Sequence, residues 1–257
     1  MATAAPFRMG ITSAAADTPR LVDVTRAKLE AIQLLFTHWS TRQDGGVGKD
    51  QVVSGTYTHL RPHRVWEVRN PALKLRFKAA EALSDAKNSA HPTTCSPMYD
   101  VKKASRFEGV RVGFHGTNPG VFQSVVANGF DDGWAKPGMM GRGIYFGDDP
   151  MKADQYTTSD NGVHYIFVCA IARSCMLEYI FDKRDRPAMF SDGEKRVPAS
   201  IPDSSDWYDG IKLTADPKFN AIRYNEAALF GHATGGLLPL YLVAYTRVGA
   251  ERQISDV

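Results

Sequence analysis

Apolar residues recur at helical spacing in two segments of the first half of the chain. The first, residues 21–39, predicts an amphipathic helix. Its apolar face comprises Leu21, Val22, Leu29, Ile32, Leu35 and Phe36. The second opens at Asn70-Pro71, a helix cap followed by a first-turn proline. Its apolar face comprises Leu73, Phe77, Ala80 and Leu83. Between the two helices, the alternation around Trp66 and Val68 predicts a strand.

The second half of the chain is richer in short strands. Segments dense in β-branched and aromatic residues predict strands at 110–117, 143–147, 164–172, 175–181, 221–231 and 238–248. Asn118-Pro119 opens a short helix that Gly129 ends, and Asp149-Pro150 opens another. We expect surface loops at 84–100 and 182–216, where proline and polar residues are frequent. Many strands with few helices predict an α+β fold.

Composition is that of an ordinary globular protein. The 257 residues are 43% hydrophobic and 23% charged, which favours one large domain at 21–250 with tails at 1–20 and 251–257. A net charge of +3 permits a dinucleotide or nucleic acid as partner without requiring one. Three cysteines without a Cys-x-x-Cys pair argue against disulfides and zinc. No apolar segment reaches membrane-spanning length, so we expect an intracellular protein, nuclear or cytoplasmic, that does not bind a membrane. We also expect no bound metal.

Residues 138–157, GMMGRGIYFGDDPMKADQYT, are the most distinctive stretch of the chain. A dinucleotide-binding fingerprint needs a small residue where Phe146 stands, so a phosphate loop is not favoured. The stretch instead predicts a strand followed by a helix, with Lys152 and Tyr156 on one helical face. Tyr145 and Tyr156 are either core aromatics or two rings that clamp a planar heterocycle.

Two further side chains are candidates for chemistry. His115 stands at the end of a predicted strand beside Gly116, where it is either a structural histidine or a ligand-binding one. Glu226 lies within an apolar strand. It either faces solvent at a strand edge or is buried for a purpose, because burying an unpaired carboxylate is costly.

Three motifs in order, FHGT, GRGIYFGDDPMKADQY and YNEAALF, resemble the catalytic domain of the poly(ADP-ribose) polymerase family. These are diphtheria-toxin-like ADP-ribosyltransferases with a His-Tyr-Glu triad. The resemblance covers roughly Thr56 to Val248, and GMMGRGIYF is nearest to the tankyrase branch, although the tankyrase zinc loop is not visible. It implies two packed, mostly antiparallel sheets with a few flanking helices.

The resemblance also implies the site. His115, Tyr145 and Glu226 would form the triad. His115 and Thr117 would bind the adenine-side ribose of NAD, Gly116 would bind the nicotinamide carboxamide, and Tyr145 and Tyr156 would sandwich the ring. Glu226 would bind the ribose 2′-hydroxyl and orient the nucleophile.

Other positions follow the family less closely. Residues 130–140 would be the donor loop that closes over NAD, with Met139 and Lys152 on the acceptor side. Ala153 stands where the family commonly has a serine that binds the carboxamide, so one hydrogen bond of NAD is missing.

The implied activity is cleavage of the nicotinamide glycosidic bond of NAD and transfer of ADP-ribose, a pentosyltransferase reaction. We expect protein acceptors, the chain itself included, with polymer synthesis favoured over single transfer. The alternatives are mono-ADP-ribosylation, transfer to nucleic acid ends, and a silent module that binds ADP-ribose or RNA. The presence of the whole triad and both tyrosines argues against the silent module.

Overall fold

The computed structural model describes 18–37, 57, 59–90, 106–107, 110–135, 138, 140, 142–172, 174, 176–180, 209–214 and 224–249. The strands are β1 (Arg20–Asp23), β2 (His59–Arg69), β3 (Arg106–Phe107), β4 (Val110–Thr117), β5 (Ile144–Gly147), β6 (His164–Ile171), β7 (Met176–Ile180), β8 (Gly210–Thr214), β9 (Glu226–Leu229) and β10 (Leu237–Val248). The helices are α1 (Thr25–Thr37), α3 (Pro71–Ala90), η1 (Pro119–Val121), α4 (Phe122–Asn128), η2 (Asp132–Trp134), α5 (Pro150–Asp154) and η4 (Gly231–Gly236). The predicted tails, except residues 18–20, lie outside these ranges.

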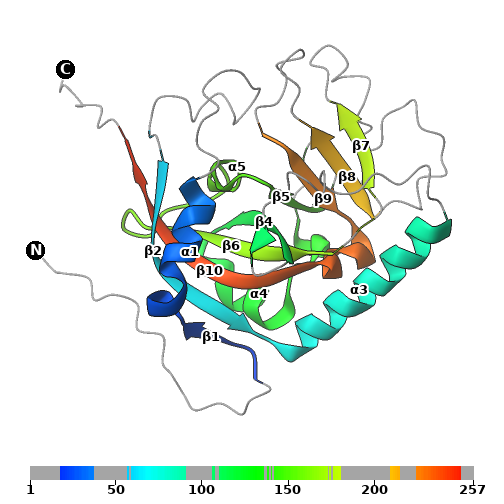
Figure 1. Cartoon of the computed structure of the whole chain (residues 1–257), viewed down its shortest axis with the longest axis horizontal. Helices are drawn as coiled ribbons and strands as arrows, with labels where there is room; N and C mark the ends of the chain where they lie inside the picture. The colour runs from blue at the N-terminus through cyan, green and yellow to red at the C-terminus, as the bar shows by residue number, and fades with distance from the viewer. Residues whose placement is uncertain are drawn as a thin grey trace, which may run out of the picture.

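The strands follow the order β1-β2-β10-β6-β4-β5-β9-β8-β7, with β3 paired to β4 (Figure 1). All described pairings are antiparallel except β7 with β8, which confirms the predicted α+β class. These pairings join the strands into one hydrogen-bonded sheet, whereas the family resemblance implied two packed sheets. Its narrowest junction lies between β4 and β5, where Phe114 and Gly147 form the single register pair.

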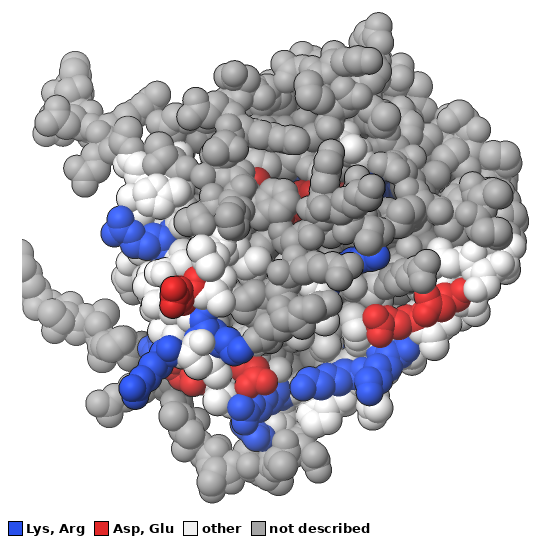
Figure 2. Space-filling model, viewed as in Figure 1, with Lys and Arg blue, Asp and Glu red and all other residues white. Residues whose placement is uncertain are grey.

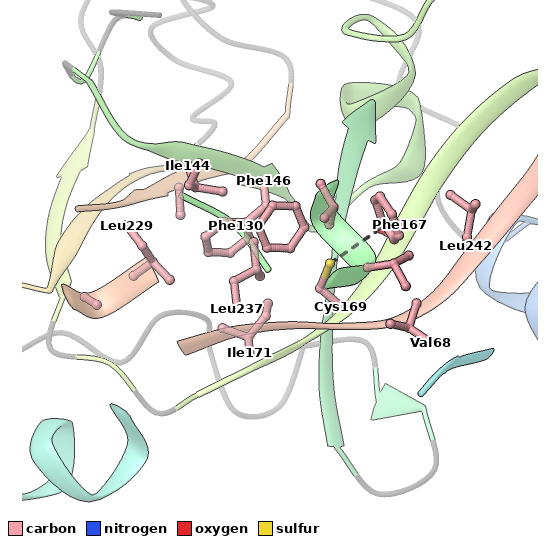
Figure 3. Close-up of a cluster of buried hydrophobic side chains, with 14 of the residues drawn as sticks. Val68, Phe130, Ile144, Phe146, Phe167, Cys169, Ile171, Leu229, Leu237 and Leu242 are labelled. Carbon is pink, nitrogen blue, oxygen red and sulfur yellow. Dashed lines mark hydrogen bonds between the residues drawn. The ribbon is translucent and has the colours of Figure 1, made fainter. Parts of the chain in front are cut away.

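The central strand β6 is buried on both faces, which explains its unbroken apolar sequence. Ile166 and Val168 point into a core covered by α1. Phe167 and Cys169 point into the opposite core, which includes α4 and is drawn in Figure 3. Alternate residues therefore serve different cores, as the period of two in a strand requires.

The first helix is shorter than predicted. Leu21 and Val22 lie in β1, where they pair with Val68 and Glu67 of β2, and α1 begins only at Thr25. The Asp23 carboxylate accepts a hydrogen bond of 3.0 Å from the Thr25 backbone N–H and so caps the helix. The rest of the apolar face is confirmed, since Ile32, Leu35 and Phe36 are buried.

The second helix is longer than predicted. Asn70 caps α3 as expected, accepting from the Leu73 N–H at 3.2 Å. The helix then runs to Ala90 through residues that we predicted to be a surface loop. Ser84 is buried there and donates a hydrogen bond of 2.7 Å to Asp209. Polar composition predicted that this segment faces solvent. Ser84 is buried instead, and the buried Asp209 carboxylate accepts its hydrogen bond.

The prediction of a surface loop at 182–216 was also wrong in part. It contains β8, which pairs with β7 on one side and β9 on the other. The other predicted strands and short helices of the second half are present, although β9 is shorter than the strand predicted at 221–231 and β3, η2 and η4 were not predicted. Within the described residues, no helix is long and apolar enough to cross a membrane.

Candidate active site

His115 on β4 contacts the backbone of Tyr145 on β5. Its Nδ1 atom lies 2.7 Å from the Tyr145 carbonyl oxygen. A carbonyl oxygen only accepts hydrogen bonds, so we assign the hydrogen to Nδ1, which makes Nε2 an acceptor in the neutral ring. Burial lowers the pKa of His115 below its ordinary value of 6.5, and the bond to Tyr145 opposes part of that shift. The ring is therefore neutral at pH 7 and can accept a hydrogen bond from a hydroxyl group.

The lowered histidine pKa values predict a stability that falls in acid. Burial lowers the folded-state pKa of His63, His115 and His164, so below pH 6.5 the unfolded chain binds more protons than the folded one. We expect the free energy of unfolding to decrease from pH 7 to pH 5. Urea unfolding at both pH values measures this. The decrease should be smaller in His115→Gln, and an identical decrease in that variant would contradict the assignment.

Gly116 allows β4 to approach α5 at the backbone. A Cβ atom here would lie 1.9 Å from the Ala153 carbonyl oxygen, so no larger residue fits without movement. The same oxygen accepts the Tyr156 N–H at 3.1 Å. The close approach thus fixes the backbone of Gly116 against the turn that carries Tyr156.

The ring of Tyr145 lies against the segment that leads into β5. Its hydroxyl accepts a hydrogen bond of 2.7 Å from the Met140 N–H. A Cβ atom at Gly138 would lie 2.6 Å from the Tyr145 ring. A glycine at 138 therefore lets the backbone lie directly against this aromatic side chain.

The predicted donor loop, residues 130–140, also contacts the site at its other end. The ring of Phe130 packs on the imidazole of His115 with centroids 4.6 Å apart. Phe130 is buried in the core drawn in Figure 3. Sequence reasoning did not single out Phe130, because an aromatic residue after a helix-ending glycine looks like any core residue.

Glu226 is buried at the start of β9 and has a cation beside it. The Nζ atom of Lys152, on α5, lies 3.4 Å from the Glu226 Oε2 atom, and both side chains are almost fully buried. The same Nζ lies 5.7 Å from the centroid of the Tyr156 ring, so the two residues are in contact, although α5 ends at Asp154 and Tyr156 follows it rather than lying on a helical face as predicted. The alternative of a solvent-facing glutamate is therefore wrong.

The ion pair itself was not predicted. Sequence reasoning placed Lys152 and Glu226 in one site but gave them no contact with each other. They are 74 positions apart, so no local spacing reports the pairing. Neighbouring β5 supplies the link, because Gly147 pairs with Glu226, and a Cβ atom at Gly147 would lie 3.1 Å from the Cβ atom of Lys152.

For the remaining predicted site residues, the structure gives burial but says less about their roles. Thr117 ends β4 and is buried, and Ala153 is buried in α5. Tyr156 is 44% exposed. Stacking of Tyr145 and Tyr156 on one ligand stays a prediction, and Met139 lies outside the described residues. In the described part of the chain, no cluster of three or more His, Cys, Asp or Glu side chains could hold a metal ion.

Comparison with known proteins gives one result. The family model for the poly(ADP-ribose) polymerase catalytic domain matches residues 50–221. That segment is about two thirds of the chain and includes His115 and Tyr145, and it ends just before Glu226. No curated protein matches the chain significantly.

Proposed function

This chain belongs to the poly(ADP-ribose) polymerase catalytic domain family, and we propose that it transfers ADP-ribose from NAD to protein acceptors. The family match is the observation that carries this proposal. The site supports it, because a neutral histidine and a glycine backbone on β4 and a buried carboxylate on β9 are linked through the intervening strand β5.

NAD would bind where β4 and β5 carry His115, Gly116 and Tyr145, beyond the single register pair that joins these strands. The Nε2 atom of His115 is the acceptor that a ribose hydroxyl needs, since Nδ1 already donates to Tyr145. Gly116 would pair its backbone N–H and C=O with the nicotinamide carboxamide. Tyr145 and Tyr156 would hold the nicotinamide ring, whose flat faces suit aromatic stacking.

The reaction exchanges one bond to the ribose C1′ atom for another. The C1′–N bond of NAD breaks with its electron pair on nitrogen, so nicotinamide leaves neutral and C1′ acquires oxocarbenium character. A nucleophilic atom of the acceptor then bonds to C1′ and releases its proton to solvent. Glu226 would bind the 2′-hydroxyl and orient the acceptor, and its carboxylate would stabilise the positive charge at the ribose.

We infer the role of Lys152 in this reaction from its contact with Glu226. Its ammonium group lies 3.4 Å from the Glu226 carboxylate and offsets part of the cost of burying that charge. The pair keeps the carboxylate inside the domain at the head of β9, where the reacting ribose would lie. Lys152 would therefore face the acceptor side, as the family resemblance implies.

We propose polymer synthesis on proteins, the chain itself included, because the triad ends in glutamate. On the one face drawn in Figure 2, the distribution of charge does not favour nucleic acid ends as the acceptor. Figure 2 shows basic side chains along α3 and beside β2 with acidic side chains between them, rather than one continuous basic surface. On α3 itself, Lys74, Arg76 and Lys78 are followed by Glu81 and Asp85.

Incubation with NAD labelled on the adenine tests these proposals. We expect label on the protein itself as a ladder of high molecular weight. A single discrete labelled band would replace the polymerase by a mono-transferase. Label on added oligonucleotide but not on protein would assign the acceptor to nucleic acid. No covalent label on either, with NAD bound, would make the chain a binding module.

A further inference from the structure

A second buried carboxylate lies beside the candidate site. Asp154, the last residue of α5, is completely buried. Its Oδ1 atom accepts hydrogen bonds from the Tyr245 hydroxyl at 2.5 Å and from Arg247 Nε at 3.0 Å. Its Oδ2 atom accepts from the Tyr57 hydroxyl. Three side chains from outside α5 therefore converge on this one group.

These contacts offset the cost of burying the charge. Arg247 supplies the opposite charge, and its guanidinium group also packs over the Tyr57 ring at 4.9 Å. Burial, with the charge of Asp154 next, raises the pKa of the Tyr57 and Tyr245 hydroxyls. Both hydroxyls therefore keep their hydrogens at neutral pH and act as donors.

The backbone of the same turn is tied down as well. The Asp154 carbonyl oxygen accepts from Arg247 Nη2 at 3.3 Å and from the Thr157 hydroxyl at 2.9 Å. The Thr157 oxygen also lies 2.9 Å from His164 Nδ1 on β6. The turn after α5 is thus attached to β6 and β10 through both its side chains and its backbone.

The last residues of α5 and the turn after it, together residues 152–156, carry the groups that would meet NAD. Lys152 contacts Glu226 and Tyr156, and the Ala153 carbonyl oxygen lies against Gly116. α5 has only five residues, which is too short to hold its own position. Its geometry must therefore come from tertiary contacts, and those centred on Asp154 join it to Tyr57, Tyr245 and Arg247.

We propose that Asp154 is a positioning residue, which through Tyr57, Tyr245 and Arg247 fixes the 152–156 turn in the orientation that binds NAD. The inference rests on the proposed function, since it concerns the same site. Asp154 touches no reacting atom in this account and acts through Lys152, Ala153 and Tyr156.

The variant Asp154→Asn retains the shape of the side chain and removes its charge. An amide nitrogen would replace one acceptor oxygen and face donors, so the turn would lose at least one of its bonds. We expect KM for NAD to rise about tenfold with kcat within about threefold of wild type, which is the pattern of lost binding rather than lost chemistry. Tyr57→Phe removes one donor and should raise KM about threefold.

Asp209→Asn is the matched control. Asp209 is also a buried carboxylate, it accepts from Lys87 Nζ at 2.6 Å and from Ser84, and it anchors α3 rather than α5. It should lower the melting temperature without changing KM. If Asp209→Asn raises KM as much as Asp154→Asn at equal loss of melting temperature, the positioning role is overturned. An unchanged KM in both Asp154→Asn and Tyr57→Phe would overturn it too.

Amide hydrogen exchange separates this proposal from the proposed function, because it needs no turnover. Amides of residues 152–157 should exchange faster in Asp154→Asn, or in Tyr57→Phe should the first variant not fold, and not in Asp209→Asn. Unchanged exchange in this segment would overturn the anchoring. Faster exchange in a chain whose wild type never releases nicotinamide would support the anchoring while the proposed function fails.

Discussion

Glu226→Gln should lower kcat for nicotinamide release by about 100- to 1,000-fold while leaving KM for NAD nearly unchanged. The amide keeps the size of the side chain but cannot stabilise positive charge at the ribose, and that interaction strengthens in the transition state. Steady-state kinetics with NAD as the varied substrate measure both constants. A KM that rises with kcat unchanged would instead assign Glu226 to substrate binding.

This variant needs a control for stability, because it removes the buried carboxylate charge that lies 3.4 Å from Lys152 Nζ. Asp209→Asn is again the matched control, because it also removes a buried carboxylate that is paired with a lysine. The Asp209 Oδ1 atom lies 2.6 Å from Lys87 Nζ. Both variants should melt at lower temperature than wild type. Only Glu226→Gln should lose activity when both are assayed well below their melting temperatures, and equal losses would contradict a catalytic role.

Gly116→Ala should reduce kcat/KM for NAD by about 100-fold, since small displacements of a binding group cost this much. Its Cβ would lie 1.9 Å from the Ala153 carbonyl oxygen, so β4 and α5 must move apart. That movement would displace the backbone that binds the carboxamide. We also expect the free energy of unfolding to fall by about 1–3 kcal/mol, as overpacking does.

Gly120→Ala is the control for the glycine substitution. A Cβ atom at Gly120 would meet nothing within 4 Å, so alanine fits there. This variant, four positions further along the chain, should match wild type in both kinetics and stability. Full activity in Gly116→Ala would show that the close approach of β4 and α5 does not matter for NAD binding.

The fold was predictable from the sequence where apolar residues follow one clear pattern, either alternating or continuous. The segments at β4, β5 and β10 carry continuous or alternating apolar residues, and each forms the expected strand. Leu21 and Val22 were misassigned because two adjacent apolar residues fit a helix or a strand equally well. Only their pairing with β2 decides between these, and that pairing depends on residues more than 40 positions away.

The sequence named the candidate site residues but not the contacts that the structure shows between them. Motif order identified His115, Tyr145 and Glu226, because each lies in a short recognisable segment. The Lys152–Glu226 pair and the bonds of Asp154 to Tyr245 and Arg247 join segments more than 70 positions apart. Asp154 drew no attention in the sequence, since an acidic residue at a helix end is ordinarily solvated.

The most direct test of the central claim is the release of nicotinamide from NAD by the purified chain, followed by chromatography over time. We predict release above the uncatalysed rate, abolished in Glu226→Gln and retained in Gly120→Ala. Binding of NAD without release, at wild-type sequence and neutral pH, would contradict an ADP-ribosyltransferase and leave a binding protein with the same fold.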